Sequence, residues 1–100
     1  MLTLPGIQQF VGNNPLAVGT SGSPVRIFSV EVVASGDGAT VVELYNSTTT
    51  TSNTNYARIN AATSKCTTVT YFMGKRFPNG CYLSTDANTA FATVVYEQEM

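Results

Sequence analysis

The fold is decided by residues 25–45, which read VRIFSVEVVA, then SGDG, then ATVVELY. From Phe28 to Ala34 apolar side chains recur at every second position, as they do along a strand that buries one face. Residues 35–38 tolerate the positive φ angles of a tight turn, and β-branched residues resume directly after them. This pattern predicts two strands joined as a β-hairpin.

Further strand-like stretches follow toward the C-terminus, each bounded by turn residues. Turn signals recur about every eight to twelve residues, and the chain has no helical periodicity longer than two turns. These features are typical of an all-β fold, an antiparallel β-sandwich, and a jelly roll is one arrangement that they allow. The expected strands cover residues 56–60, 65–72, 81–84 and 89–97, and the expected turns cover 73–80 and 85–88.

The first 24 residues differ from the rest because they hold three of the four prolines and are rich in glycine. Frequent proline and glycine residues argue against a regular helix or a central strand here. Two short apolar clusters, Ile7–Val11 and Leu16–Val18, are expected to pair only briefly with a sheet edge. The predicted organisation is therefore an extended N-terminal arm at 1–24 and one sandwich domain at 25–100.

The composition argues against several classes of function. Only 11% of the residues are charged, the chain has no His, and its net charge is −1. Enzymes usually need a titratable pair or a metal-ligand set, and nucleic-acid binding needs clustered Lys and Arg. Glu31 and Glu43, the acids that could face each other across the predicted hairpin, would repel. We expect a protein that is not an enzyme, with no cofactor, no metal and no nucleic-acid partner.

Membrane and secretory signals are missing as well. The apolar runs are far shorter than the roughly 20 residues that span a bilayer, so we expect no membrane partner. The start, MLTLP, lacks the basic and apolar regions of a signal peptide, which places the newly made protein in a cytoplasm. Cys66 and Cys81 are interpreted as half-buried reduced thiols, and a disulfide between them stays open.

Ten aromatic residues are many for a thin two-sheet core, so part of them is expected at an interface. Phe10, Tyr56 and Phe77 lie in less regular segments and are the aromatic contact candidates. Lys75 and Arg76 precede Phe77, and this turn is either simply solvated or an ionic clamp onto an acidic neighbour with Phe77 as its anchor. The aromatic residues expected to fill the core are Phe28, Phe72, Tyr82, Phe91 and Tyr96.

Residues 46–55, NSTTTTSNTN, are polar and uncharged. They are either a solvated linker or a contact loop whose hydroxyl and amide groups bind a neighbouring subunit or a glycan.

Three strings resemble those of small β-rich virion proteins of tailed bacteriophages: VRIFSV at 25–30, FPNGCYLS at 77–84 and ATVVYE at 92–97. The resemblance implies a capsid cement or decoration protein, or a minor portal or tail component, with no catalytic residue to carry over. It implies location in the virion after assembly in the host cytoplasm, and the major capsid protein as partner.

The resulting hypothesis is a sandwich that forms a homo-oligomer, either a trimer or a dimer. It docks on a capsid through its N-terminal arm and the turn at residues 75–77. The alternative is a receptor-binding or carbohydrate-binding β module of the tail or capsid surface, which would use residues 46–55 and Tyr56 or Tyr82.

Overall fold

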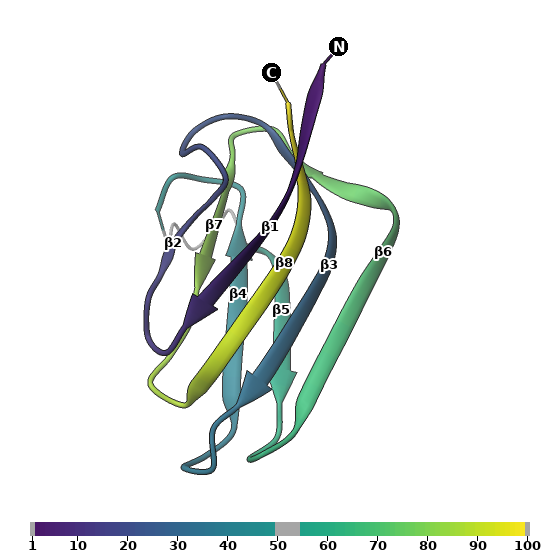
Figure 1. Ribbon diagram of the computed structural model, residues 1–100. Helices are drawn as coiled ribbons and strands as arrows, with labels where there is room; N and C mark the ends of the chain where they lie inside the picture. Colours follow the sequence, from purple (N-terminus) through teal and green to yellow (C-terminus); the bar gives the residue numbers. More distant parts are fainter. Residues whose placement is uncertain (1, 50–54, 100) are drawn as a thin grey trace.

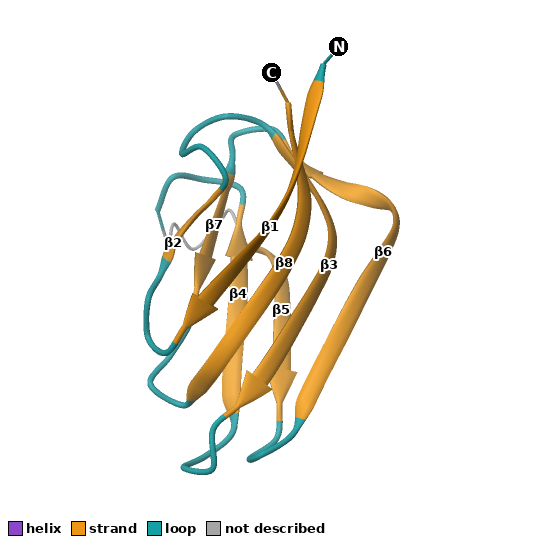
Figure 2. Ribbon diagram, in the orientation of Figure 1, coloured by secondary structure: helices purple, strands orange, loops and turns teal. Residues whose placement is uncertain are grey.

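The computed structural model describes residues 2–49 and 55–99, and in these residues every regular element is a β-strand (Figure 1). Two four-stranded sheets pack face to face, which confirms the predicted all-β antiparallel sandwich (Figure 2). Sheet A has the strand order β1-β8-β3-β6, and sheet B has the order β2-β7-β4-β5. The strands are β1 (Thr3–Val11), β2 (Leu16–Val18), β3 (Val25–Ala34), β4 (Thr40–Tyr45), β5 (Asn55–Ala61), β6 (Cys66–Phe77), β7 (Cys81–Ser84) and β8 (Thr89–Glu99).

The strand pairing follows one rule along the chain. The first strand pairs with the last, β2 with β7, β3 with β6 and β4 with β5, all antiparallel. This is the pairing of one long hairpin, and rolling it up joins β8 to β3 and β7 to β4. An eight-stranded double sheet of this kind is a jelly roll.

The predicted hairpin of residues 25–45 is wrong, although both of its strands exist. β3 lies in sheet A and β4 in sheet B, so the turn between them crosses from one sheet to the other. Glu31 consequently lies opposite Thr68 and Thr93, and Glu43 lies opposite Arg58. Alternating apolar residues specify which face of a strand is buried, but either sheet of a sandwich can bury that face.

The predicted N-terminal arm is also corrected, because residues 1–24 contribute two strands to the sandwich. β1 pairs with β8 in continuous register from Thr3 opposite Glu99 to Val11 opposite Phe91, and β2 pairs with β7. Pro5 fits this assignment because β1 is an edge strand, where a missing N–H facing away from the sheet costs no ladder bond. The proline that suggested an arm is thus a residue of a paired strand.

The core lies between the two sheets and draws side chains from all eight strands. Sheet A contributes Val and Ile at alternate positions of its central strands, and sheet B adds Val42, Leu44 and Leu83. No transmembrane-helix candidate occurs within residues 2–49 and 55–99. The buried cluster is Phe10, Val18, Val25, Ile27, Val30, Val32, Ala34, Val42, Leu44, Ile59, Ala61, Phe77, Cys81, Leu83, Ala92 and Val94.

Candidate interaction surface

Two of the predicted contact residues are core residues. Phe10 is 1% exposed and lies opposite Ala92, whose small side chain leaves room for the ring between the sheets. Phe77 is fully buried opposite Val25. The expectation that these two rings lie at the surface is wrong, because each falls on the inward parity of a strand that the sequence pattern did not reveal.

Tyr56 and Lys75 lie together beside Phe77 at the open side of the sandwich, between β5 and β6. The Tyr56 and Phe77 rings pack with centroids 5.3 Å apart. The Lys75 ammonium lies 5.8 Å from the centroid of Tyr56 and 5.6 Å from that of Tyr71, within the range of cation–π attraction. Three of the five predicted contact residues therefore meet, but their contacts are with one another and bind β5 to β6.

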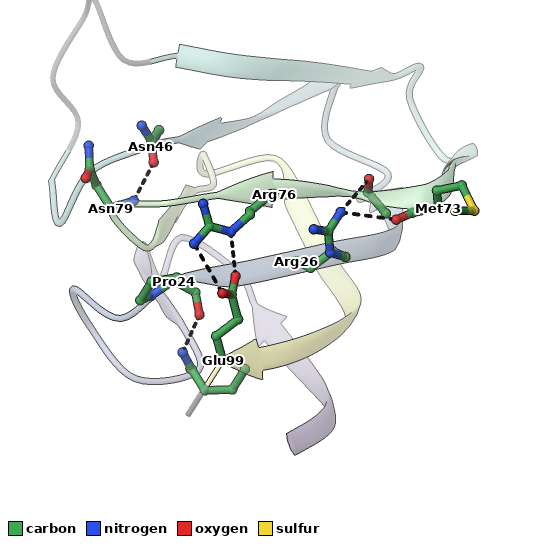
Figure 3. Close-up of polar contacts among 9 residues, drawn as sticks. Pro24, Arg26, Asn46, Met73, Arg76, Asn79 and Glu99 are labelled. Carbon is green, nitrogen blue, oxygen red and sulfur yellow. Dashed lines mark hydrogen bonds and ion pairs between the residues drawn. The ribbon is translucent and has the colours of Figure 1, made fainter. Parts of the chain in front are cut away.

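Arg76 is likewise engaged within the chain. Its Nε donates to Glu99 Oε2 at 2.7 Å and its Nη2 donates to Glu99 Oε1 at 3.1 Å, a bidentate pair across the end of sheet A (Figure 3). Hydrogen bonds from Arg76 lower the pKa of the Glu99 carboxyl. The predicted turn at 73–80 is a strand as far as Phe77, so neither cation of the expected clamp stands on a free turn.

The most exposed aromatic ring belongs to a residue expected in the core. Phe72 is 92% exposed and Met73 is 74% exposed. They lie in what we call the β6 bulge, residues 71–74, four residues that stand opposite Phe28 alone between two regular stretches of β3–β6 pairing. Met73 and Gly74 have φ angles of 69° and 77°, a left-handed pair that turns the backbone out of the ladder.

Arg26 braces the β6 bulge from the neighbouring strand. Its Nη1 donates to the carbonyl oxygens of Met73 and Gly74 at 3.2 and 3.5 Å (Figure 3). A non-glycine residue held at positive φ costs energy that the surrounding structure must supply, and such positions concentrate at functional sites. The structure thus holds two large apolar side chains in solvent at a strained and supported place.

Apolar side chains also cross the outer face of sheet A, the face turned away from sheet B. The register aligns Val11, Phe91, Val33 and Cys66 in one row over all four strands, and Val11 is 65% exposed. A second row begins with Ile7, 74% exposed, opposite Val95 and continues with Ser29 and Thr70. The row between them consists of Gln9, Thr93, Glu31 and Thr68.

The charges of this face are gathered at one end and have opposite signs. Glu97 lies opposite Arg26, which lies opposite Arg76, and Arg76 holds Glu99. Away from this end, Glu31 is the charged residue in the three rows that cross the sheet. The outer face of sheet A is therefore mostly apolar or uncharged.

The outer face of sheet B has a different character. The cross-strand row of Ser84, Glu43 and Arg58 is polar, and the next row along β5 places Asn60 opposite Val41. A further row on this face, Ala17, Tyr82 and Tyr45, carries two rings, but Tyr45 is buried and Tyr82 is partly buried. The two outer faces of the sandwich thus differ in their exposed side chains, which are largely polar or charged on sheet B.

Phe72 could have been placed from its parity. It continues the alternation of Cys66, Thr68 and Thr70, whereas Val69 and Tyr71 pack against the core. Threonine is rarely buried in a core, so Thr68 and Thr70 indicate that this side of the strand faces outward, and Phe72 lies on the same side. The other four aromatic residues expected in the core are partly buried, and of these Tyr96 packs directly on the core cluster.

The two cysteines are far from alike. Cys81 is buried in the core, and burial raises the pKa of its thiol to about 12. Cys66 is exposed on the outer face of sheet A. Both are free thiols, and they belong to different sheets, so the interpretation as two similar half-buried thiols is corrected.

Part of the polar loop at 46–55 is ordered by hydrogen bonds, and residues 50–54 lie outside the described residues. Asn46 is buried, and its amide donates to the Tyr56 hydroxyl and accepts from the Asn79 N–H. Residues 2–49 and 55–99 contain no cavity and no group of three His, Cys, Asp or Glu side chains able to hold a metal ion.

Comparisons with known proteins identify the fold and no family. No family model matches the chain, and no curated protein matches its sequence. A structure described as "Bacillus endospore appendages form a novel family of disulfide-linked pili" matches with a TM-score of 0.50 at 12% identity, covering 97% of this chain and 84% of that one.

Two further structures match with lower scores. The capsid particle of the extra small virus of the prawn Macrobrachium rosenbergii has a TM-score of 0.42 at 11% identity, covering 100% of this chain and 81% of that one. The Schizosaccharomyces pombe Cnp3 cupin domain has a TM-score of 0.38 at 12% identity, covering 98% of this chain and 52% of that one. At 12% identity the likeness to the endospore appendage structure is one of fold alone.

Proposed function

We propose that this chain is a structural protein of a virion, a capsid cement or decoration protein of a tailed bacteriophage that bridges neighbouring shell subunits. The observation that carries the proposal is the contrast between the two outer faces. Large exposed apolar side chains lie on both edge strands of sheet A, Ile7 and Val11 on β1 and Phe72 and Met73 on β6, whereas the exposed side chains on the outer face of sheet B are mostly polar or charged. Exposed apolar surface of this kind marks a site of protein association.

In this proposal the major capsid protein covers the outer face of sheet A, and the polar face of sheet B remains in solvent. Phe72 and Met73 act as the apolar anchor, because projecting aromatic side chains that enter a partner's pocket dominate interface energies. Lys75 and Arg76 make no ionic clamp here, since Tyr56, Tyr71 and Glu99 already hold them. Modest contacts per copy suffice because many copies act together on one shell.

The proposal is tested on particles assembled with variant chains. Phe72→Asp is expected to abolish attachment to the shell while the free protein melts like wild type, since the ring is 92% exposed. The matched control is Asn60→Asp, which places the same carboxylate on the outer face of sheet B and should attach normally. Quantitative mass spectrometry of purified particles reads out copy number. Equal incorporation of both variants would refute the docking face.

The alternative, a receptor-binding or carbohydrate-binding module, receives less support from the same contacts. Its candidate Tyr56 packs at a tilt against Phe77, lies beside the Lys75 ammonium and has its hydroxyl bonded by Asn46. The residue is 42% exposed, but its ring and hydroxyl already have partners within the chain. Glycan binding by the isolated protein that is lost in Tyr56→Ala or Tyr82→Ala would favour this alternative over cement.

A further inference from the structure

A sandwich of two open sheets has four edge strands, and here three of them are closed to further pairing. The edge of β2 is capped by Gln8, whose amide donates to Ala17 O at 3.0 Å and accepts from Gly19 N–H at 2.9 Å. The Gln8 amide therefore occupies the backbone groups that an added strand would need to pair with β2. The edge of β5 faces β6 of the other sheet: the Asn60 carbonyl accepts from the Thr67 hydroxyl at 2.7 Å, and Tyr56 packs against Phe77 and Lys75, so these contacts obstruct an added strand.

The edge of β6 is closed in another way. The β6 bulge interrupts its ladder, and the left-handed residues Met73 and Gly74 twist the backbone away from a straight edge. Bulges and twists are the usual protection of edge strands against association. An added strand could not follow β6 along its length.

The remaining edge, that of β1, is long and open. Gly12 donates its N–H to Ala90 O across the β1–β8 ladder, so residues of even number point their backbone groups at β8. The odd residues Ile7, Gln9 and Val11 therefore direct N–H and C=O groups outward, and Pro5 directs a C=O. Within the described residues, these outward groups make no hydrogen bond.

The composition of β1 offers little of the usual protection. Its sequence TLPGIQQFV contains no charged residue, and Leu4, Ile7 and Val11 are 58%, 74% and 65% exposed. Natural edge strands are normally blunted by Lys or other charges, by Pro, by bulges or by short length, and β1 carries one of these, Pro5 near its start. The uncharged stretch from Ile7 to Val11, with its outward N–H and C=O groups, remains a template for another strand.

We propose that β1 pairs antiparallel with β1 of a second copy, forming a two-fold dimer in which the two A sheets become one continuous sheet. An antiparallel strand is self-complementary about a two-fold axis, and the absence of charge removes repulsion between identical strands. The register that overlaps the whole strand places Ile7 opposite Ile7 of the second copy and Thr3 opposite Val11 of the second copy. Pro5 then lies opposite Gln9 of the second copy, where the ladder lacks one hydrogen bond on each side of the axis because proline has no N–H.

This register also extends the apolar surface. Ile7 lies beside Val95 within each copy, so the dimer carries one row that runs from Val95 through both Ile7 side chains to Val95 of the second copy. Apolar side chains directly opposite on one face stabilise strand pairing. This dimer is a proposal separate from the attachment to a shell. It can be measured on the purified chain without any capsid, so either proposal can fail while the other stands.

The experiment is sedimentation equilibrium of the purified protein and two variants. Wild type is expected to be a dimer, and Ile7→Lys is expected to weaken the dimer about 100-fold, because two ammonium groups replace two apolar side chains at the axis. Thr68→Lys is the matched control: it adds the same charge to the outer face of sheet A at the opposite edge and should dimerise like wild type. A monomeric wild type, a trimer, or an Ile7→Lys dimer of unchanged affinity overturns the proposal.

Cross-linking tests the register independently of any loss of folding. In a Cys66→Ser background, Ile7→Cys should form an intermolecular disulfide on mild oxidation, since Cα atoms of such a hydrogen-bonded pair lie about 5.5 Å apart. Thr68→Cys in the same background should remain a free thiol. Equal cross-linking of both variants, or none at position 7, contradicts the β1–β1 pairing.

Discussion

Gly74 is the residue at which the β6 bulge depends on the absence of a side chain. It has a φ of 77°, and a Cβ there would overlap Arg26 Cγ and lie 3.0 Å from Phe28 Cε1. Gly12 has a similar φ of 67° with nothing within 4 Å of an added Cβ. An alanine at Gly12 would therefore bear only the strain of a positive φ angle, whereas an alanine at Gly74 would bear that strain and also a steric clash.

We expect Gly74→Ala to lower the free energy of unfolding by about 2–4 kcal/mol, and Gly12→Ala to lower it by only about 1 kcal/mol. Urea unfolding monitored by tyrosine fluorescence measures both. Equal losses would mean that Arg26 and Phe28 move aside at no cost and do not brace the bulge.

Asp86 organises the turn before β8. Burial of its carboxyl raises the pKa, but hydrogen bonds from the Thr40 hydroxyl and from the N–H groups of Val41 and Asn88 outweigh this and lower it. A folded-state pKa below the unfolded value means that the unfolded chain binds the proton more readily. The stabilisation by Asp86 is thus present near neutral pH and is lost as the pH falls below about 4.

Asp86→Ala is expected to cost about 1–2 kcal/mol of unfolding free energy at neutral pH, and the difference from wild type should shrink in acid. Asp37→Ala, in the exposed turn after β3, is the control and should change little. Urea unfolding across a pH series provides the measurement. A difference that stays constant through the acid range would contradict the assigned hydrogen bonds.

At the scale of elements, Gln8 joins the edges of the two sheets by capping β2 from β1. Gln8→Ala would leave Ala17 O and Gly19 N–H without this partner, at an expected cost of about 1–2 kcal/mol and with faster hydrogen exchange at Gly19. Gln9→Ala is the matched control, since Gln9 is exposed and its amide makes one long contact of 3.4 Å to Thr93. Unchanged exchange at Gly19 in the Gln8 variant would show that the cap is dispensable.

At the scale of the whole molecule, the N-terminal residues belong to the fold. Deleting residues 1–24 removes Phe10 and Val18 from the core and strips the ladder from one side of β8. We expect the shortened chain to lose cooperative thermal unfolding in circular dichroism, because core truncations of this size exceed the margin of a small domain. A chain that begins at Thr3 should melt like wild type. Cooperative folding of residues 25–100 alone would instead support the prediction that residues 1–24 are an arm separate from the folded domain.

Strand positions could be predicted from the sequence because period-two alternation is a local property. The bounds of β3 and β7 agree with the predicted stretches, and β8 extends the prediction by two residues. The all-β sandwich followed from the number of such stretches and from the turn residues between them. The low charge and the lack of His were visible in the composition alone.

Pairing partners, faces and exposure were decided only by the tertiary structure. Local alternation cannot say which sheet receives a strand, so β3 and β4 were expected as one hairpin although rolling the chain separates them. It also cannot say whether a ring on a strand faces the core. For that reason Phe72 was expected in the core but is exposed, and Phe77 was expected at the surface but is buried. The open edge of β1 depends on residues as distant as Gly12 and Ala90, because an edge is defined by which long-range pairings end there.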